Sequence, residues 1–171
     1  AKTSVMAESI PDNGGIFFVP AFTGLGAPHW NTGARGMIIG ITAATSKEQI
    51  TRAALESMAY QTRDLLEEME RNSGIKLKEL KVDGGASKND FLMQFQADIL
   101  NCRVVRPKDI ETTALGACYL AGLGCGIFKS EDEIKELWEA DRVFEPQMDE
   151  ETRENLYAQW CKAVEKSKDW L

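Results

Sequence analysis

Short apolar runs and one alternating stretch predict four strands along this chain. Residues 16–19 are continuously apolar, which is typical of a buried strand, and residues 36–41 form a second apolar strand. Residues 77–82 alternate apolar and charged side chains, the period-two pattern of a half-buried strand. Residues 103–105 form a fourth short strand that Pro107 ends.

Apolar residues at helical spacing predict the helices that separate and follow these strands. The ranges are 47–71 with Ser46 as cap and a stop at 72–74, 88–100, 111–122 capped by Thr112, 130–140 capped by Ser130, and 150–170. Residues 1–14 form a poorly defined leading segment that is helical or irregular, and residues 143–146 are extended. This order predicts an α/β fold in one domain over residues 1–171, with parallel β-α-β pairing within 77–125.

The turn between the strand at 77–82 and the next helix is the strongest candidate site. Residues 82–89 read Val-Asp-Gly-Gly-Ala-Ser-Lys-Asn, and Gly84 and Gly85 let the backbone approach a ligand closely. We expect Ser87 to cap the helix and Asp90 to complete a capping box, so that the helix N-terminus faces the turn. That arrangement suits an anionic or polar ligand. The alternative is a tight turn whose glycines serve geometry only, because neither a Walker A loop nor G-x-G-x-x-G is present.

Three other features have both a chemical and a structural interpretation. His29 lies next to Trp30 within a long loop at residues 20–35 that carries aromatic residues, but one histidine without an obvious partner favours a structural role. Asp83 and Asp90 resemble a carboxylate pair, yet turn chemistry and capping explain them better. The small residues of helix 111–122 would let another backbone come close, unless the helix is simply tightly buried. They are Gly116, Ala117 and Ala121.

Composition excludes several classes of protein. The net charge of −7 argues against a nucleic-acid-binding face, and no polybasic run is present for an anionic membrane. No apolar run approaches the length of a membrane span. The four cysteines show no Cys-x-x-Cys pair and one histidine leaves too few partners for zinc, so we expect no metal site. We interpret the cysteines as buried or partly buried reduced thiols, which indicates the cytoplasm.

Several stretches together resemble the FGGY carbohydrate kinases, and among them the glycerol kinases. Residues 36–41, 49–50 and 53–56 match the second signature of that family. The other matching stretches are 22–30, 60–64, 82–86, 92–100 and 111–117. The resemblance runs from about Gly15 to the C-terminus and covers the C-terminal third or so of such a kinase.

This resemblance implies a partial RNase H-like C-terminal domain of the actin, sugar kinase and Hsp70 superfamily. Such kinases use ATP and Mg²⁺ to phosphorylate glycerol to sn-glycerol 3-phosphate. Carried over by position, Gly85 and Asn89 would contact ATP or ADP, with Gly84 and Ala86 shaping the loop. The helix from Thr112 would pack at the interdomain hinge, and Glu56 of the signature would make a structural or interdomain polar contact.

The resemblance places the catalytic aspartate, the glycerol-binding residues, the Mg²⁺ ligands and both phosphate loops outside this chain. We therefore expect no catalytic residue here and no activity of the chain alone. An incomplete sheet would expose an apolar edge, so we also expect self-association and a homo-oligomer. Two alternatives remain: another FGGY kinase acting on a pentose or pentulose, and a non-catalytic interaction module.

Overall fold

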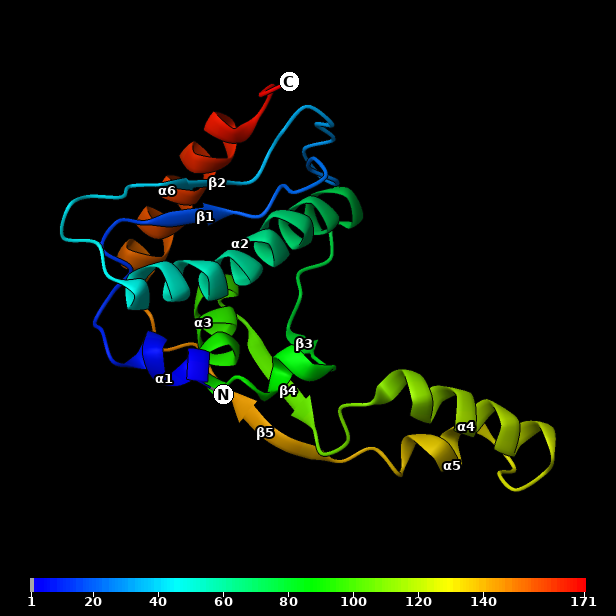
Figure 1. Ribbon diagram of the computed structural model, residues 1–171. Coiled ribbons are helices and arrows are strands. Elements are labelled where there is room, and N and C mark those ends of the chain that lie inside the picture. The colour runs from blue at the N-terminus through cyan, green and yellow to red at the C-terminus, as the bar shows by residue number, and fades with distance from the viewer. Residues whose placement is uncertain (1) are drawn as a thin grey trace.

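The computed structural model describes residues 2–171 and contains two small sheets (Figure 1). Strand β1 (Phe17–Val19) pairs antiparallel with β2 (Met37–Ile39). In the second sheet β4 (Arg103–Pro107) lies between β3 (Glu79–Lys81) and β5 (Ala140–Phe144). β3 runs parallel to β4 and β5 runs antiparallel to it, so the predicted parallel β-α-β unit is confirmed.

Three helices and strand β1 enclose the main core. Helices α2 (Lys47–Ser73), α3 (Asp90–Leu100) and α6 (Glu150–Ser167) pack together, and α2 and α6 both contact β1. Tyr60 of α2 lies at the centre of an aromatic cluster. Its ring stacks on Trp160 at 5.2 Å between centroids and also contacts Phe17 and Phe95. Helix α1 (Lys2–Glu8) packs on α2 and α3.

Local signals at the two ends of α2 fix its length as expected. Ser46 forms a capping box with Gln49, in which each side chain bonds the other residue's backbone N–H. Gly74 ends the helix in the left-handed conformation and donates its N–H to the carbonyl of Glu70 at 2.8 Å.

His29 has a structural partner that the sequence did not reveal. Its Nε2 lies 3.1 Å from Oδ2 of the buried Asp64, so the loop at residues 20–35 is tied to α2. Asp64 also accepts hydrogen bonds from Tyr157 Oη at 2.7 Å and from the buried Trp160 Nε1 at 2.9 Å. This buried carboxylate therefore joins the loop, α2 and α6, and the structural interpretation of His29 is supported.

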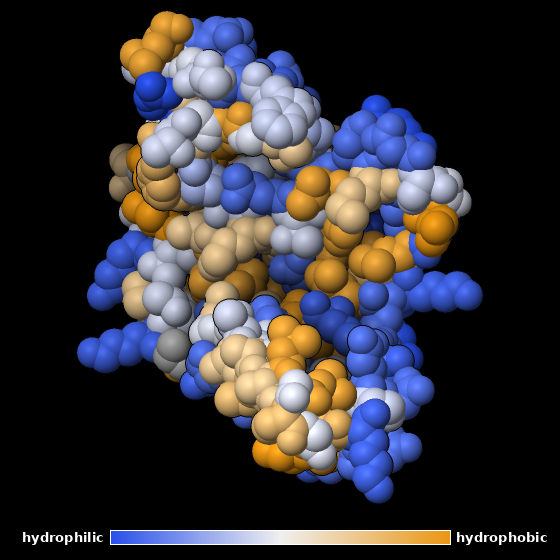
Figure 2. Space-filling model, turned by 90° about the vertical axis from the view of Figure 1, so that its right-hand side faces the viewer, coloured by the Kyte–Doolittle hydropathy of each residue, from blue (hydrophilic) through white to orange (hydrophobic). Residues whose placement is uncertain are grey.

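Helices α4 (Thr112–Gly124) and α5 (Glu131–Lys135) form an arm that extends from the second sheet (Figure 1). Apart from Gly122, every residue of α4 is at least partly exposed, so the alternative of a tightly buried helix is wrong for this chain. Gly122 packs on Phe128, whereas a Cβ built at Gly116 would meet no atom within 4 Å. Figure 2 views the arm side, where hydrophobic residues gather on the lower surface.

Two further expectations are corrected or supported by exposure. Only Cys102 is buried, and the other three thiols are exposed, so the prediction of buried or partly buried cysteines is wrong for Cys118, Cys125 and Cys161.

The first sheet does expose apolar side chains. Ile38 and Ile39 of β2 are each 37% exposed. Among the described residues, no helix combines the length and apolarity needed to cross a bilayer.

Candidate functional site

The turn at residues 82–89 follows β3, and it contains a short 3₁₀ helix, Gly85–Lys88, before α3 begins. Since β3 and β4 are parallel, the turn lies at their carboxyl ends, where open α/β sheets place ligands. The structure therefore brings the four predicted site residues, Gly84, Gly85, Ala86 and Asn89, into one turn.

Gly84 is required by the backbone of the turn. Its φ of +73° is a conformation that L-residues rarely adopt. Its N–H donates to the carbonyl of Ile110 at 2.9 Å, and its own carbonyl accepts from the N–H and the hydroxyl of Ser87. The prediction that Ser87 caps the helix is wrong, because its hydroxyl closes the 3₁₀ turn instead.

Asn89 is the residue that caps α3. Its buried side chain accepts the N–H of Leu92 at 3.1 Å, and its backbone N–H donates to the carbonyl of Ala86. Asp90 forms ion pairs with Arg106 and Arg142 rather than the expected capping box. A carboxylate and a side-chain cap therefore already occupy the start of α3, which weakens our expectation that this helix end faces an anion.

Gly85 and Ala86 are the accessible part of the turn. Both residues are exposed, and Gly85 does not have a positive φ. A Cβ built at Gly85 would meet no heavy atom within 4 Å. Neither backbone conformation nor packing within this chain therefore requires a glycine at position 85.

The turn is also tied to the segment that leads into α4. The hydroxyl of Thr112 donates to the carboxylate of Asp83, which supports the turn role of that aspartate. The expectation that Thr112 caps α4 is wrong, because Glu111 precedes the helix as its N-cap and makes no side-chain capping bond. The strand-end turn and the start of the arm are thus one connected region.

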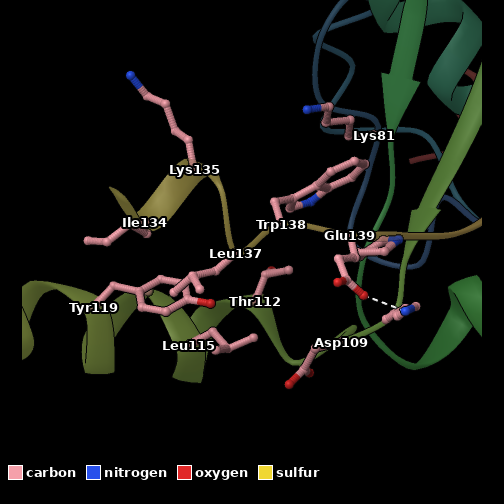
Figure 3. A pocket seen from close by; sticks show the side chains of 13 residues that line it. Lys81, Asp109, Thr112, Leu115, Tyr119, Ile134, Lys135, Leu137, Trp138 and Glu139 are labelled. Atoms are coloured by element: carbon pink, nitrogen blue, oxygen red, sulfur yellow. Dashed lines mark hydrogen bonds and ion pairs between the residues drawn. The ribbon is translucent and has the colours of Figure 1, made fainter. Parts of the chain in front are cut away.

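A cavity of about 450 Å³ lies between β3, α4 and the chain from α5 to β5 (Figure 3). Lys81 lies over the Trp138 ring, with Nζ 4.2 Å from the centroid. The hydrogen bond between Lys108 and Glu139 raises the pKa of the lysine and lowers that of the glutamate. The sequence alone does not predict this cavity, because the residues that line it come from separate elements and share no motif.

The described residues contain no group of three His, Cys, Asp or Glu side chains that could hold a metal ion. Asp83 of the turn accepts a hydrogen bond from Thr112, and Asp90, the first residue of α3, forms ion pairs with two arginines.

Comparisons with known proteins agree with this architecture. The C-terminal domain of the FGGY family of carbohydrate kinases matches residues 2–125. The chain is 62% identical to "Glycerol kinase 2" of Sulfolobus acidocaldarius over 165 residues, and 62% identical to "Glycerol kinase" of Pseudothermotoga lettingae over 171 residues. These alignments cover 96% and 100% of this chain, but only 33% and 34% of the relatives. The chain thus spans about a third of the length of the curated relatives it matches.

Solved structures give the same result. The crystal structure of Plasmodium falciparum glycerol kinase with ADP superposes with a TM-score of 0.87 at 40% identity. That alignment covers 97% of this chain and 33% of the other. The gluconate kinase of Lactobacillus acidophilus superposes with a TM-score of 0.79 at 28% identity, covering 96% of this chain and 34% of the other. The chain therefore belongs to the FGGY family of carbohydrate kinases, and the part that the family match covers is the C-terminal domain.

Proposed function

We propose that this chain forms the adenosine-binding side of an ATP-dependent glycerol kinase. In this proposal Gly85 and Asn89 contact the nucleotide, while Gly84 and Ala86 shape the turn. The whole enzyme transfers the γ-phosphoryl group of ATP to a primary hydroxyl of glycerol and gives sn-glycerol 3-phosphate.

The observation that carries this proposal is the unexplained glycine at position 85. Gly84 has a backbone reason to be glycine, but Gly85 has an ordinary φ and open space around it. Glycine is used where the backbone must approach a ligand closely, so a nucleotide against position 85 would account for this residue. The structure of the Plasmodium glycerol kinase was determined with ADP, and 97% of this chain superposes on it.

The substrate follows from the relatives rather than from residues in this chain. Identity to the two named glycerol kinases is 62%, whereas identity to the gluconate kinase is 28%. This difference favours glycerol over another sugar or sugar acid. We propose that glycerol and Mg²⁺ are held by the part of the kinase that lies outside the matched third.

The exposed arm supports a partner within the same enzyme. Gly116 lies within α4, where glycine costs about 1 kcal/mol relative to alanine, and a Cβ built there would meet no heavy atom of the described residues within 4 Å. Exposed apolar side chains accompany it, with Leu120 at 71% and Ile127 at 70%. We propose that another part of the kinase packs on this helix at the hinge between domains. We further expect the kinase to be cytoplasmic and to form a homo-oligomer. Light scattering on the purified kinase would test the oligomeric state.

Phosphoryl transfer depends on positioning and on neutralising the phosphate charge. We expect the chain alone to be inactive, because it spans about a third of its relatives' length and we assign the catalytic and phosphate-binding groups to the rest of the kinase. The test measures glycerol- and ATP-dependent ADP release by the purified 171-residue chain, together with ADP binding by calorimetry. We expect binding without turnover. Turnover by the isolated chain, or the absence of ADP binding, would overturn this proposal.

A further inference from the structure

The side chain of Arg106 reaches from β4 to the backbone of the candidate turn. Its Nη1 donates to the carbonyl of Ser87 at 2.8 Å and to Oδ1 of Asp90 at 2.7 Å. Its Nε donates to Oδ2 of Asp141 at 2.8 Å. The Arg106 side chain is only 13% exposed, whereas the side chains of Asp90 and Asp141 are 43% and 46% exposed.

The surrounding structure fixes the guanidinium in this place. The register of the pairing between β4 and β5 shifts between Arg106 and Pro107. This irregularity lies directly beside the arginine whose side chain bonds the turn. The guanidinium also lies 5.5 Å from the ring centroid of Phe144, which is buried in the core. Arg106 is therefore held by β5 on one side and holds the turn on the other.

Two of the bonds that attach the turn lie on either side of its exposed part. At its start the N–H of Gly84 bonds the carbonyl of Ile110, and at its end the carbonyl of Ser87 accepts from Arg106. The exposed residues Gly85 and Ala86 lie between these two bonds. We propose that Arg106 is a positioning residue for the nucleotide: it holds the Gly85–Asn89 backbone where the ligand binds. This inference rests on the proposed function of the turn.

Arg142 provides a matched control within the same ion-pair cluster. It also bonds the carboxylate of Asp90, at 2.5 Å, and also lies over the Phe144 ring. Its side chain is 54% exposed, and the described bonds of Arg142 include none to the backbone of residues 82–89. The two arginines thus differ in their contact with the carbonyl of Ser87.

The experiment measures ADP affinity by titration calorimetry for the chain and its variants. We expect Arg106→Met to weaken ADP binding about tenfold, equivalent to about 1.4 kcal/mol. Arg142→Met should change affinity less than twofold. A second readout is the amide signals of Gly85 and Ala86 without ligand, which Arg106→Met should shift and Arg142→Met should leave near their original positions.

A general loss of stability must be separated from loss of positioning. Val164→Ala weakens the core of α6 far from the turn in the fold, and it should leave ADP affinity unchanged even where its melting temperature falls as much. If Arg106→Met does not fold, Arg106→Lys keeps the charge, but its single nitrogen cannot bond Ser87 and Asp90 and also bond Asp141 as the separate nitrogens of Arg106 do, and it should lose about threefold.

Two outcomes count against the inference and are distinguishable. A folded Arg106 variant that binds ADP within twofold of the original chain would overturn the positioning role alone. An original chain that binds no ADP would overturn the proposed function and the positioning role together.

Discussion

Adjacent glycines in the candidate turn should respond to alanine in opposite ways. Gly84 has a φ of +73° and a ψ of 177°, a region essentially open to glycine only, and it costs an L-residue about 1–3 kcal/mol. Gly85 has no positive φ, and a Cβ there meets nothing within 4 Å. We therefore expect Gly84→Ala to lower the free energy of unfolding by about 1 kcal/mol. Gly85→Ala should leave it unchanged or raise it by up to about 1 kcal/mol, because alanine reduces the freedom of the unfolded chain.

ADP affinity, unlike stability, should be sensitive to alanine at position 85. A methyl group at position 85 would occupy space that we assign to the nucleotide, and overpacking typically costs about 1–3 kcal/mol. The expected loss of affinity for Gly85→Ala is thus about tenfold or more, since tenfold corresponds to about 1.4 kcal/mol.

Urea unfolding gives the free energy of unfolding, and titration calorimetry gives the dissociation constant for ADP. The decisive pattern is a Gly85→Ala chain that is as stable as the original but binds ADP poorly. If Gly85→Ala binds ADP as tightly as the original chain, position 85 does not contact the nucleotide and the main support for the site is lost.

Three further predictions concern the rest of the chain. Gly116→Ala should raise the free energy of unfolding by up to about 1 kcal/mol in urea titrations, because that helical position is open; destabilisation would show an unseen contact. Asp64→Leu should lower the free energy of unfolding by about 1–3 kcal/mol, because it leaves the buried indole N–H of Trp160 without an acceptor. Adding Trp160→Phe removes that N–H, so the loss in the double variant should be smaller than the sum of the two single losses; additive losses would contradict this coupling. Burial raises the pKa of Glu56 above 4.5 despite its ion pair with Arg52, so the folded state holds this proton more tightly than the unfolded chain. The stability that this proton contributes is fully present below pH 4.5 and is lost as the pH rises through the folded pKa. The free energy of unfolding should therefore fall less over this pH range in Glu56→Gln than in the original chain; equal slopes would refute the raised pKa of Glu56.

Features set by nearby residues were predicted well from the sequence. Ser46 and Gly74 carry their capping chemistry within one turn of helix α2, and the structure confirms both ends. The parallel pairing of β3 and β4 followed from the strand-helix-strand order alone. These signals need no knowledge of the rest of the fold.

Features that depend on distant contacts were not predictable in the same way. Ser87 and Asn89 are both good caps, and the choice between them depends on a 3₁₀ turn that distant Arg106 helps to hold. Strand β5 was read only as an extended segment near Val143 because it is largely exposed and lacks an apolar pattern. The exposure of α4 could not be inferred, since its apolar composition is also typical of a buried helix.

We assign the adenosine part of a nucleotide to the turn at residues 82–89. The most direct measurement is the change in backbone amide signals of the ¹⁵N-labelled chain on addition of ADP. We predict saturable shifts that are largest at Gly85 and Asn89 and small in α6. No shift at these two residues at saturating ADP, or shifts centred elsewhere, would contradict the assignment of this turn.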